Sequence, residues 1–268
     1  MGYQTIRYER RGYVGMLALA RPEKHNAQNP LMWQELAQLG AELLSDPTLR
    51  SLVVAGDGPS FSAGIDLIEG LAGIIADFAA RPPDEHSLEV GLSVAGTFSW
   101  IPKLACPSIA AVQGHAYGAG LQLAIACDFR VFGENADVGL TETRYGILPD
   151  MGATVRLPRI VGESRARELI LLGEVIDASE ALRIGLANRV VPDAEVLEAA
   201  TELAVRLAGQ PPLAVQGARR AIEAAWFSDP DDSFAVAVEA QIRCLESEDF
   251  KEAARATAEG RTPEWTGR

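Results

Sequence analysis

The chain contains few lysines, histidines and cysteines. Of its 268 residues, three are lysine, three are histidine and three are cysteine. Cys106, Cys127 and Cys244 are odd in number, widely spaced and set mostly in apolar surroundings. We interpret them as reduced packing residues rather than as disulfides or a metal cluster. Because the histidines do not cluster either, we expect no metal site.

Positive charge and long apolar runs are also scarce. The net charge is -13 and the isoelectric point is near 4.7, which argues against a protein that binds nucleic acid through a basic face. The sequence contains no apolar run that is long enough, and free enough of polar residues, to span a bilayer. The N-terminus lacks the charged-then-apolar pattern of a signal peptide. We therefore expect a cytoplasmic protein with neither a nucleic-acid nor a membrane partner.

The hydrophobic pattern that is present predicts an α/β fold. Apolar runs at residues 51–56, 108–113 and 129–132 are typical of buried strands, and β-like runs near the N-terminus predict a hairpin. Residues 30–44 have helical periodicity, residues 142–158 are rich in loop formers, and almost everything beyond residue 163 is expected to be helical. This order predicts an α/β core over residues 1–195 and a helical C-terminal region over residues 196–268.

Two glycine-containing turns stand out within the core. Residues 114–128 open with small residues and continue as an apolar helix that ends before Asp128. Because Gly118 and Gly120 lack Cβ, a ligand or another backbone can approach closely there. Residues 58–67 form a second turn of the same kind, which we expect to pass from a strand into a helix. The free N–H groups at two helix starts could then point at one oxygen.

Five segments together resemble the crotonase (enoyl-CoA hydratase/isomerase) superfamily, and the resemblance covers essentially the whole chain. They are residues 21–27, 61–67, 117–128, 185–191 and 250–253. The resemblance implies a spiral of β-β-α units with C-terminal helices that assemble homotrimers, often paired into hexamers. Residues 68–99 are expected to form an insert that shapes the wall of the pocket, and the sequence leaves the acyl chain of the substrate open.

The resemblance also implies how the chain handles an acyl-CoA thioester, with coenzyme A as part of the substrate and no separate cofactor. The backbone N–H groups of Ile65 and Ala119 would hold the thioester oxygen as it becomes negative. Tyr117, Leu67 and Gln122 would line the substrate pocket. Six residues would contact coenzyme A, with Lys251 reaching the ligand of a neighbouring subunit: Lys24, Ala27, Ala63, Asp66, Phe250 and Lys251.

Three side chains decide which reaction the resemblance implies. Hydratases of the family carry carboxyls at the positions of Gln122 and Glu142, and an amide cannot exchange a proton with water at neutral pH. Glu142 remains, and Asp150 eight residues later resembles the pairing in the dienoyl-CoA isomerase branch, although that branch has an aspartate at the position of Gln122. We therefore expect Glu142 and Asp150 to be catalytic and favour double-bond isomerisation over hydration. The alternative is an acyl-CoA binding protein on the same fold that has lost catalysis.

Overall fold

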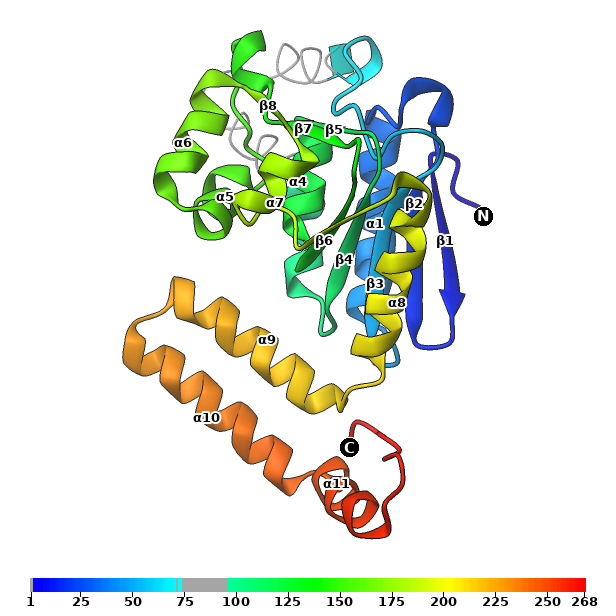
Figure 1. Cartoon of the computed structure of the whole chain (residues 1–268), viewed down its shortest axis with the longest axis vertical. Coiled ribbons are helices and arrows are strands. Elements are labelled where there is room, and N and C mark those ends of the chain that lie inside the picture. Colours follow the sequence, from blue (N-terminus) through cyan, green and yellow to red (C-terminus); the bar gives the residue numbers. More distant parts are fainter. Residues whose placement is uncertain (1, 71, 74–95) are drawn as a thin grey trace.

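The structure is a computed structural model, and it describes residues 2–70, 72–73 and 96–268 (Figure 1). It confirms the mixed α/β class, with a helical C-terminal region. Most of the insert expected over residues 68–99 lies outside the described residues. In the described part of the chain, no helix is long and apolar enough to cross a membrane.

The main sheet has six strands in the order β1-β2-β3-β4-β6-β9. Strands β1 and β2 pair antiparallel, which confirms the predicted hairpin, and the other neighbours run parallel. The strands are β1 (Ile6–Arg11), β2 (Val14–Leu19), β3 (Ser51–Gly56), β4 (Ser108–Val112), β6 (Phe129–Gly133) and β9 (Arg189–Val191).

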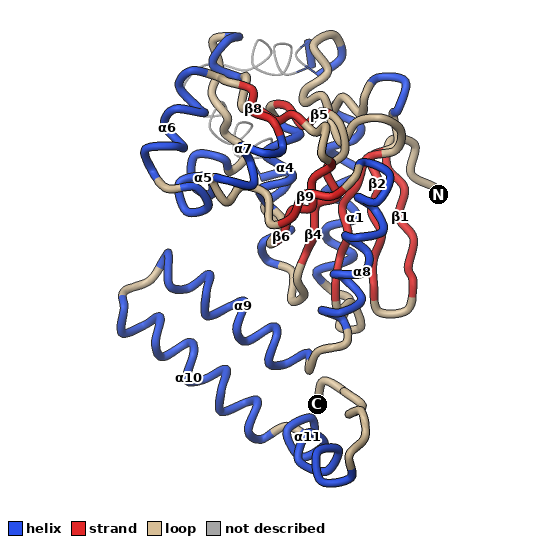
Figure 2. Tube along the Cα trace, in the orientation of Figure 1, coloured by secondary structure: helices blue, strands red, loops and turns tan. Residues whose placement is uncertain are grey.

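Helices cover both faces of this sheet, with α1 (Pro30–Leu44) on one face and α8 (Val196–Ala208) on the other (Figure 2). Leu52 and Val54 of β3 belong to the same buried cluster as the apolar side of α1, whereas Val53 belongs to the cluster that contains α8. Successive strand residues face opposite sides, so an unbroken apolar run is what a doubly covered strand requires. The division of the chain at residue 195 into a core and a C-terminal region stays a prediction. Helix α8 falls in the predicted C-terminal region, yet it packs against the core sheet.

A second sheet of three short strands corrects two expectations. It contains β5 (His115–Tyr117), β7 (Asp137–Gly139) and β8 (Val175–Asp177) in that order. We expected a single turn between β4 and the buried helix, but β5 lies inside that stretch. We also expected almost everything after residue 163 to be helical and predicted no strand there, but β8 and β9 lie in that region. Strands of three residues are too short to produce a recognisable alternation of apolar and polar residues.

The remaining helices surround the second sheet or extend from the core. The stretch expected to be a loop, residues 142–158, contains the start of a helix, α5 (Ala153–Val161). Pro158, which we expected to be a loop former, lies inside this helix. The helices are α4 (Ala119–Ala126), α5 (Ala153–Val161), α6 (Glu163–Leu172), α7 (Ala178–Arg183), α9 (Pro212–Phe227), α10 (Pro230–Glu246) and α11 (Glu248–Glu259). Short 3-10 turns are η1 (Pro22–Lys24), η2 (Gly96–Phe98), η3 (Ile101–Lys103), η4 (Glu142–Tyr145) and η5 (Asp193–Glu195).

Helices α9 to α11 project away from the sheets as an arm, with α9 and α10 packed side by side (Figure 1). Arg219 of α9 is one of the side chains that anchor the arm to the core. Its Nε donates to Asp128 Oδ1 at 2.8 Å, and its Nη1 donates to the carbonyl oxygen of Pro102 at 2.9 Å. Because a guanidinium presents several donors in a fixed fork, this one residue holds α9 against two separate core segments.

Candidate active site

A cavity of about 360 Å³ lies where the two glycine-containing segments meet η4. Seven of the residues singled out in the sequence line it: Ala63, Ile65, Leu67, Tyr117, Gly118, Ala119 and Glu142. Several other lining residues were not predicted from the sequence, among them Thr141, Arg144, Tyr145, Ile147 and Val175. These residues are hard to predict from the sequence because they are ordinary loop and strand residues. Only the closeness of most of them to Glu142 in the sequence connects them with the site.

Two backbone segments run directly beside each other along this cavity. Tyr117 N donates to Ser62 O at 3.0 Å, and a Cβ on Gly64 would lie 2.6 Å from Tyr117 O. Gly64 has φ +90°, which favours glycine as well. The absence of a side chain at Gly64 therefore keeps residues 62–65 close to residues 117–119.

The N–H groups of Ile65 and Ala119 have no hydrogen-bond partner within the part of the chain that the structure describes. Ala119 is the first residue of α4, where the N–H has no intrahelical acceptor. Ile65 differs from expectation, because helical residues begin only at Glu69. Ile65 instead pairs with Gln28, through Gln28 N to Gly64 O at 2.7 Å and Asp66 N to Gln28 O at 2.8 Å. In this parallel pairing the neighbouring peptide groups bond to Gln28, and the Ile65 N–H is left unpaired.

Glu142, in the η4 turn, is buried, with 5% of its surface exposed. Its Oε1 accepts a hydrogen bond from Gln122 Nε2 at 2.8 Å, whereas its Oε2 is buried without a hydrogen-bond partner among the described residues. Burial raises the pKa of Glu142, and the nearby charge of Asp150 raises it further, while hydrogen bonds from the Glu142 backbone and Gln122 lower it. A carboxyl group with a raised pKa is suited to both taking and returning a proton.

Gln122 and Asp150 lie close to Glu142 without lining the described cavity. Every residue of α4, including Gln122, is buried, so the amide sits behind the carboxyl rather than in the open pocket. Its Oε1 accepts a hydrogen bond from the backbone N–H of Ala153, at the start of α5, at 3.3 Å. Asp150 lies in the loop before α5, and partial desolvation raises the pKa of its carboxyl.

Tyr117 lines the cavity and belongs to a polar cluster with Asp137 and His115. Its hydroxyl donates to Asp137 Oδ2 at 2.7 Å, its ring stacks on His115 with centroids 5.2 Å apart, and His115 Nδ1 also contacts Asp137. Burial and the Asp137 carboxylate raise the pKa of Tyr117 to about 12. The phenol therefore stays neutral at physiological pH and forms a fixed part of the cavity wall.

The residues expected to bind coenzyme A fall into two groups. Lys24, Ala27, Ala63 and Asp66 belong to two loops near the cavity that are tied together, since Arg21 Nη1 bonds to Asp66 Oδ2 at 3.1 Å and Ala63 N donates to His25 O at 2.8 Å. Phe250 and Lys251 lie on α11, at the far end of the arm (Figure 1), where Lys251 pairs with Glu248 at 2.6 Å. A single chain does not bring the second group to the cavity.

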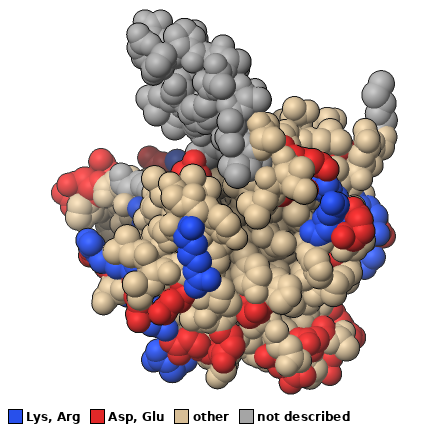
Figure 3. Space-filling model, turned by 90° about the horizontal axis from the view of Figure 1, so that it is seen from above, with Lys and Arg blue, Asp and Glu red and all other residues tan. Residues whose placement is uncertain are grey.

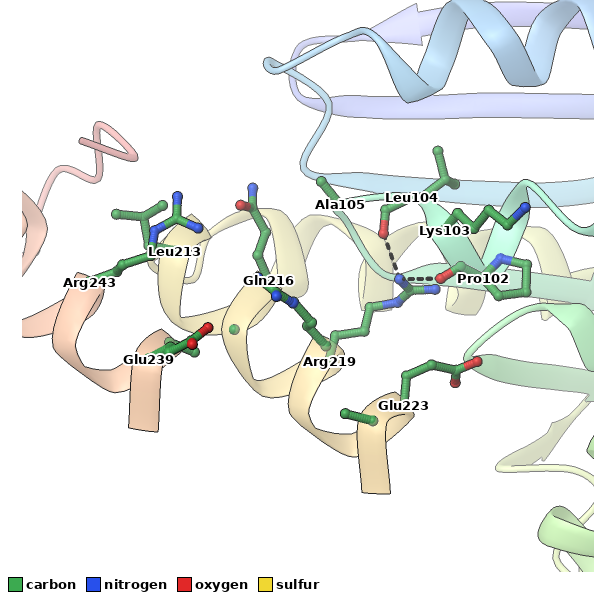
Figure 4. A pocket seen from close by; sticks show the side chains of 14 residues that line it. Pro102, Lys103, Leu104, Ala105, Leu213, Gln216, Arg219, Glu223, Glu239 and Arg243 are labelled. Carbon is green, nitrogen blue, oxygen red and sulfur yellow. Dashed lines mark hydrogen bonds between the residues drawn. The ribbon is translucent and has the colours of Figure 1, made fainter. Parts of the chain in front are cut away.

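A larger cavity, of about 690 Å³, lies between the arm and the core (Figure 4). It is lined by η3, α9 and α10, and the side chain of Arg219 points across it to the carbonyl oxygens of the core loop. None of the residues predicted for catalysis lines it.

On the face seen in Figure 3, acidic and basic side chains are interspersed around the described surface. Within the described residues there is no group of three or more side chains suited to hold a metal ion.

Comparison with known proteins gives a consistent result. Residues 9–268 match the family described as enoyl-CoA hydratase/isomerase. The sequence is 34% identical to a crotonyl-CoA hydratase of Syntrophomonas wolfei, covering 97% of both chains, and 34% identical to a carnitinyl-CoA dehydratase of Proteus mirabilis, covering 99% of both. The fold is similar to the crystal structure of an enoyl-CoA hydratase from Bacillus anthracis, with a TM-score of 0.88, 32% identity and coverage of 99% of this chain and 100% of that one.

Proposed function

The chain belongs to the enoyl-CoA hydratase/isomerase family, and on that premise we propose that it moves a double bond along an unsaturated acyl-CoA by proton transfer. The observation that carries this proposal is the set of groups around the cavity of about 360 Å³. One carboxyl group, that of Glu142, lines it, and so do the two residues with unpaired N–H groups, Ile65 and Ala119. The family acts on acyl-CoA thioesters, so this cavity is the place for the thioester and the adjoining carbons.

In the proposed reaction, Glu142 removes a proton from a carbon of the acyl chain, and the electrons of that C–H bond shift into a conjugated enolate. The negative charge resides on the thioester oxygen, where the N–H groups of Ile65 and Ala119 stabilise it. The protonated Glu142 then returns the proton to a different carbon, and the double bond has moved. No water is added, and one carboxyl group is enough. Asp150 either tunes the pKa of Glu142 or delivers the second proton.

Hydration is the second candidate, because relatives at 33–34% identity are named as hydratases. Adding water requires groups that hold the water, remove one proton from it and supply another. Glu142 can do part of this work, but the neighbouring Gln122 amide can only donate and accept hydrogen bonds. The amide is also already hydrogen-bonded at both ends, to Glu142 at 2.8 Å and to Ala153 at 3.3 Å, instead of facing a water in the cavity. These bonds further support isomerisation over hydration.

A panel of thioesters distinguishes the two reactions. We expect purified protein to convert three-enoyl or dienoyl CoA thioesters into their positional isomers, and to hydrate crotonyl-CoA only slowly. Absorbance of the conjugated thioester follows both reactions, and mass spectrometry separates them because hydration adds one water. Rapid hydration of crotonyl-CoA without any isomerisation would overturn the preferred reaction. Absence of turnover with every thioester that binds would leave only ligand binding.

We also propose that the protein is a homotrimer or a dimer of trimers, in which Phe250 and Lys251 approach the ligand of a neighbouring subunit. Support comes from their distance from the cavity in one chain and from the exposed apolar side chains of the arm. Trp226 and Phe234 are 56% and 72% exposed, and burial of one such side chain typically contributes about 1.5–3 kcal/mol.

Light scattering coupled to gel filtration is expected to give a mass of three or six chains at micromolar concentration. Replacing Phe234 with aspartate should shift the mass towards smaller species, because a charge would have to be buried in the interface. The matched control is Tyr13→Asp, which also places a charge at an exposed aromatic position, 52% exposed, but on the core hairpin. A monomeric wild-type protein would contradict the proposal.

A further inference from the structure

We infer that Gln122 is a positioning residue that occupies Oε1 of Glu142 and thereby confines proton exchange with the substrate to Oε2. This inference deepens the proposed function and rests on Glu142 being the acid–base group. It assigns to Gln122 a role in orienting the carboxyl group instead of a role in binding the acyl chain. The contacts of three groups carry it: the Gln122 amide, the Glu142 carboxyl and the first N–H of α5.

The chemistry of its neighbours fixes the orientation of the Gln122 amide. Ala153 N can only donate a hydrogen bond, so the atom that faces it at 3.3 Å must be the carbonyl oxygen of Gln122. The NH₂ group then faces Glu142 Oε1 at 2.8 Å, where an ionised carboxylate accepts. A rotated amide would place its NH₂ group against the N–H of Ala153 and its oxygen against Oε1. Both contacts would be repulsive, which excludes that orientation.

Burial makes this arrangement costly to abandon. Gln122 is 2% exposed and Glu142 is 5% exposed, so water does not replace either bond. A buried polar group without its partner loses the full free energy of its interaction with water. The backbone at the start of α5 therefore holds the amide, and the amide in turn holds the carboxyl group. Gln122 connects α4, η4 and α5 through two hydrogen bonds.

The consequence concerns which oxygen of Glu142 carries the proton. Protonation at Oε1 would turn the acceptor of the Gln122 N–H into a hydroxyl oxygen, which is a poorer acceptor than a carboxylate oxygen, so that bond would be weakened. Protonation at Oε2 leaves it intact. Oε2 is also the oxygen that is buried with no partner among the described residues, and such an atom calls for an explanation such as catalysis. A substrate C–H bond placed beside Oε2 would supply the missing contact.

Exchanging Gln122 for methionine tests this assignment, because methionine has a similar length and cannot donate a hydrogen bond. Ionised Glu142 then loses a donor, and we expect its pKa to rise by about one pH unit. Carbon-13 NMR of labelled glutamate carboxyls follows the titration, with the Glu142 signal assigned by its loss in Glu142→Gln. Since the base must be ionised, the acidic limb of the kcat/KM profile should move to higher pH by the same amount.

The control and a second variant keep the test independent of folding. Gln113→Met removes a glutamine whose Nε2 donates to Gly56 O at 2.6 Å, away from the cavity, and should leave the Glu142 titration unchanged. Gln122→Glu keeps the shape and the acceptor for Ala153 N but places two carboxyl groups together. The pair should share one proton and titrate in two separated steps.

Other charged or titratable groups around Glu142 remain constant in both variants. In the described part of the chain they are Asp150 in the loop before α5, Tyr117 on β5, and Arg144 and Tyr145 on η4. An unchanged Glu142 titration in Gln122→Met and a single unshifted step in Gln122→Glu would overturn the assignment. The NMR titration needs no turnover. A shifted pKa in an inactive protein would therefore confirm that Gln122 occupies Oε1 of Glu142 but remove the proposed reaction and, with it, the role of Oε2 in that reaction. Isomerisation without a pKa shift would keep the reaction and overturn the role of Gln122.

Discussion

Replacing Glu142 with glutamine is expected to lower kcat by about a hundred- to ten-thousand-fold, the range typical for loss of a general acid–base group. The amide keeps the size of the carboxyl group but can neither take up nor return a proton. Ligand affinity should stay close to that of the wild type, because the amide keeps the shape of the side chain that lines the cavity. Steady-state kinetics on the preferred substrate and calorimetry with an acyl-CoA measure the two quantities.

Glu134→Gln is the matched control, since Glu134 is an exposed glutamate in the turn after β6 and does not line the cavity. It should retain wild-type kcat. If Glu142→Gln kept turnover within about tenfold of the wild type, below the usual effect of such a group, another residue would be the acid–base group. If Glu142→Gln shows the expected loss, Asp150→Asn separates the two roles proposed for Asp150. A small effect means that Asp150 only tunes Glu142, and a loss as large as that of Glu142→Gln means that it delivers the second proton.

Gly64→Ala is expected to reduce kcat by about a hundred- to a thousand-fold, comparable to removing one donor of an oxyanion hole. The added Cβ would lie 2.6 Å from Tyr117 O, which is closer than real contacts allow, so the two backbone segments must separate. The N–H groups of Ile65 and Ala119, which we propose to hold the thioester oxygen, would then be too far apart to bind one oxygen together. Because the amides come from the backbone, a change in spacing is the practical way to disable them.

Gly12→Ala separates this effect from simple backbone strain. Gly12 has φ +60° and nothing within 4 Å of an added Cβ, so alanine there pays the strain of a positive φ without a clash and far from the cavity. Both variants should lose some thermal stability, and only Gly64→Ala should lose turnover per folded protein. Equal kcat values in the two variants would mean that the spacing of these segments does not matter for catalysis.

The elements predicted well from sequence are those with long, regular patterns. Helix α1 (Pro30–Leu44) begins at a proline suited to the first turn and continues with apolar residues at helical spacing, and β3 (Ser51–Gly56) is an unbroken apolar run. Both were predicted with their observed bounds. The three-residue strands β5, β7, β8 and β9 were missed, because their pairing depends on neighbours that lie far away in sequence.

The candidate site shows a similar division. The segments containing Gly64 and Gly118 could be selected because small residues interrupt apolar runs there, and in the structure both line one cavity. The bond between Gln122 and Ala153 could not be predicted, since 31 residues separate them and the contact depends on how α5 packs against α4. The sequence suggested a loop around Pro158, so the helix that supplies the Ala153 N–H was itself unexpected.

The burial of Glu142 also has a consequence for the folding equilibrium. Because its pKa is raised in the folded protein, the folded state binds this proton more tightly than the unfolded chain does. The contribution of Glu142 to the unfolding free energy is therefore most favourable at acidic pH, and it declines as the pH rises from the unfolded pKa through the folded one. At pH values above the folded pKa, the ionised, half-satisfied carboxylate weakens the fold that surrounds it. Other parts of the core must offset that loss, as they do for any protein that keeps a strained group for its chemistry.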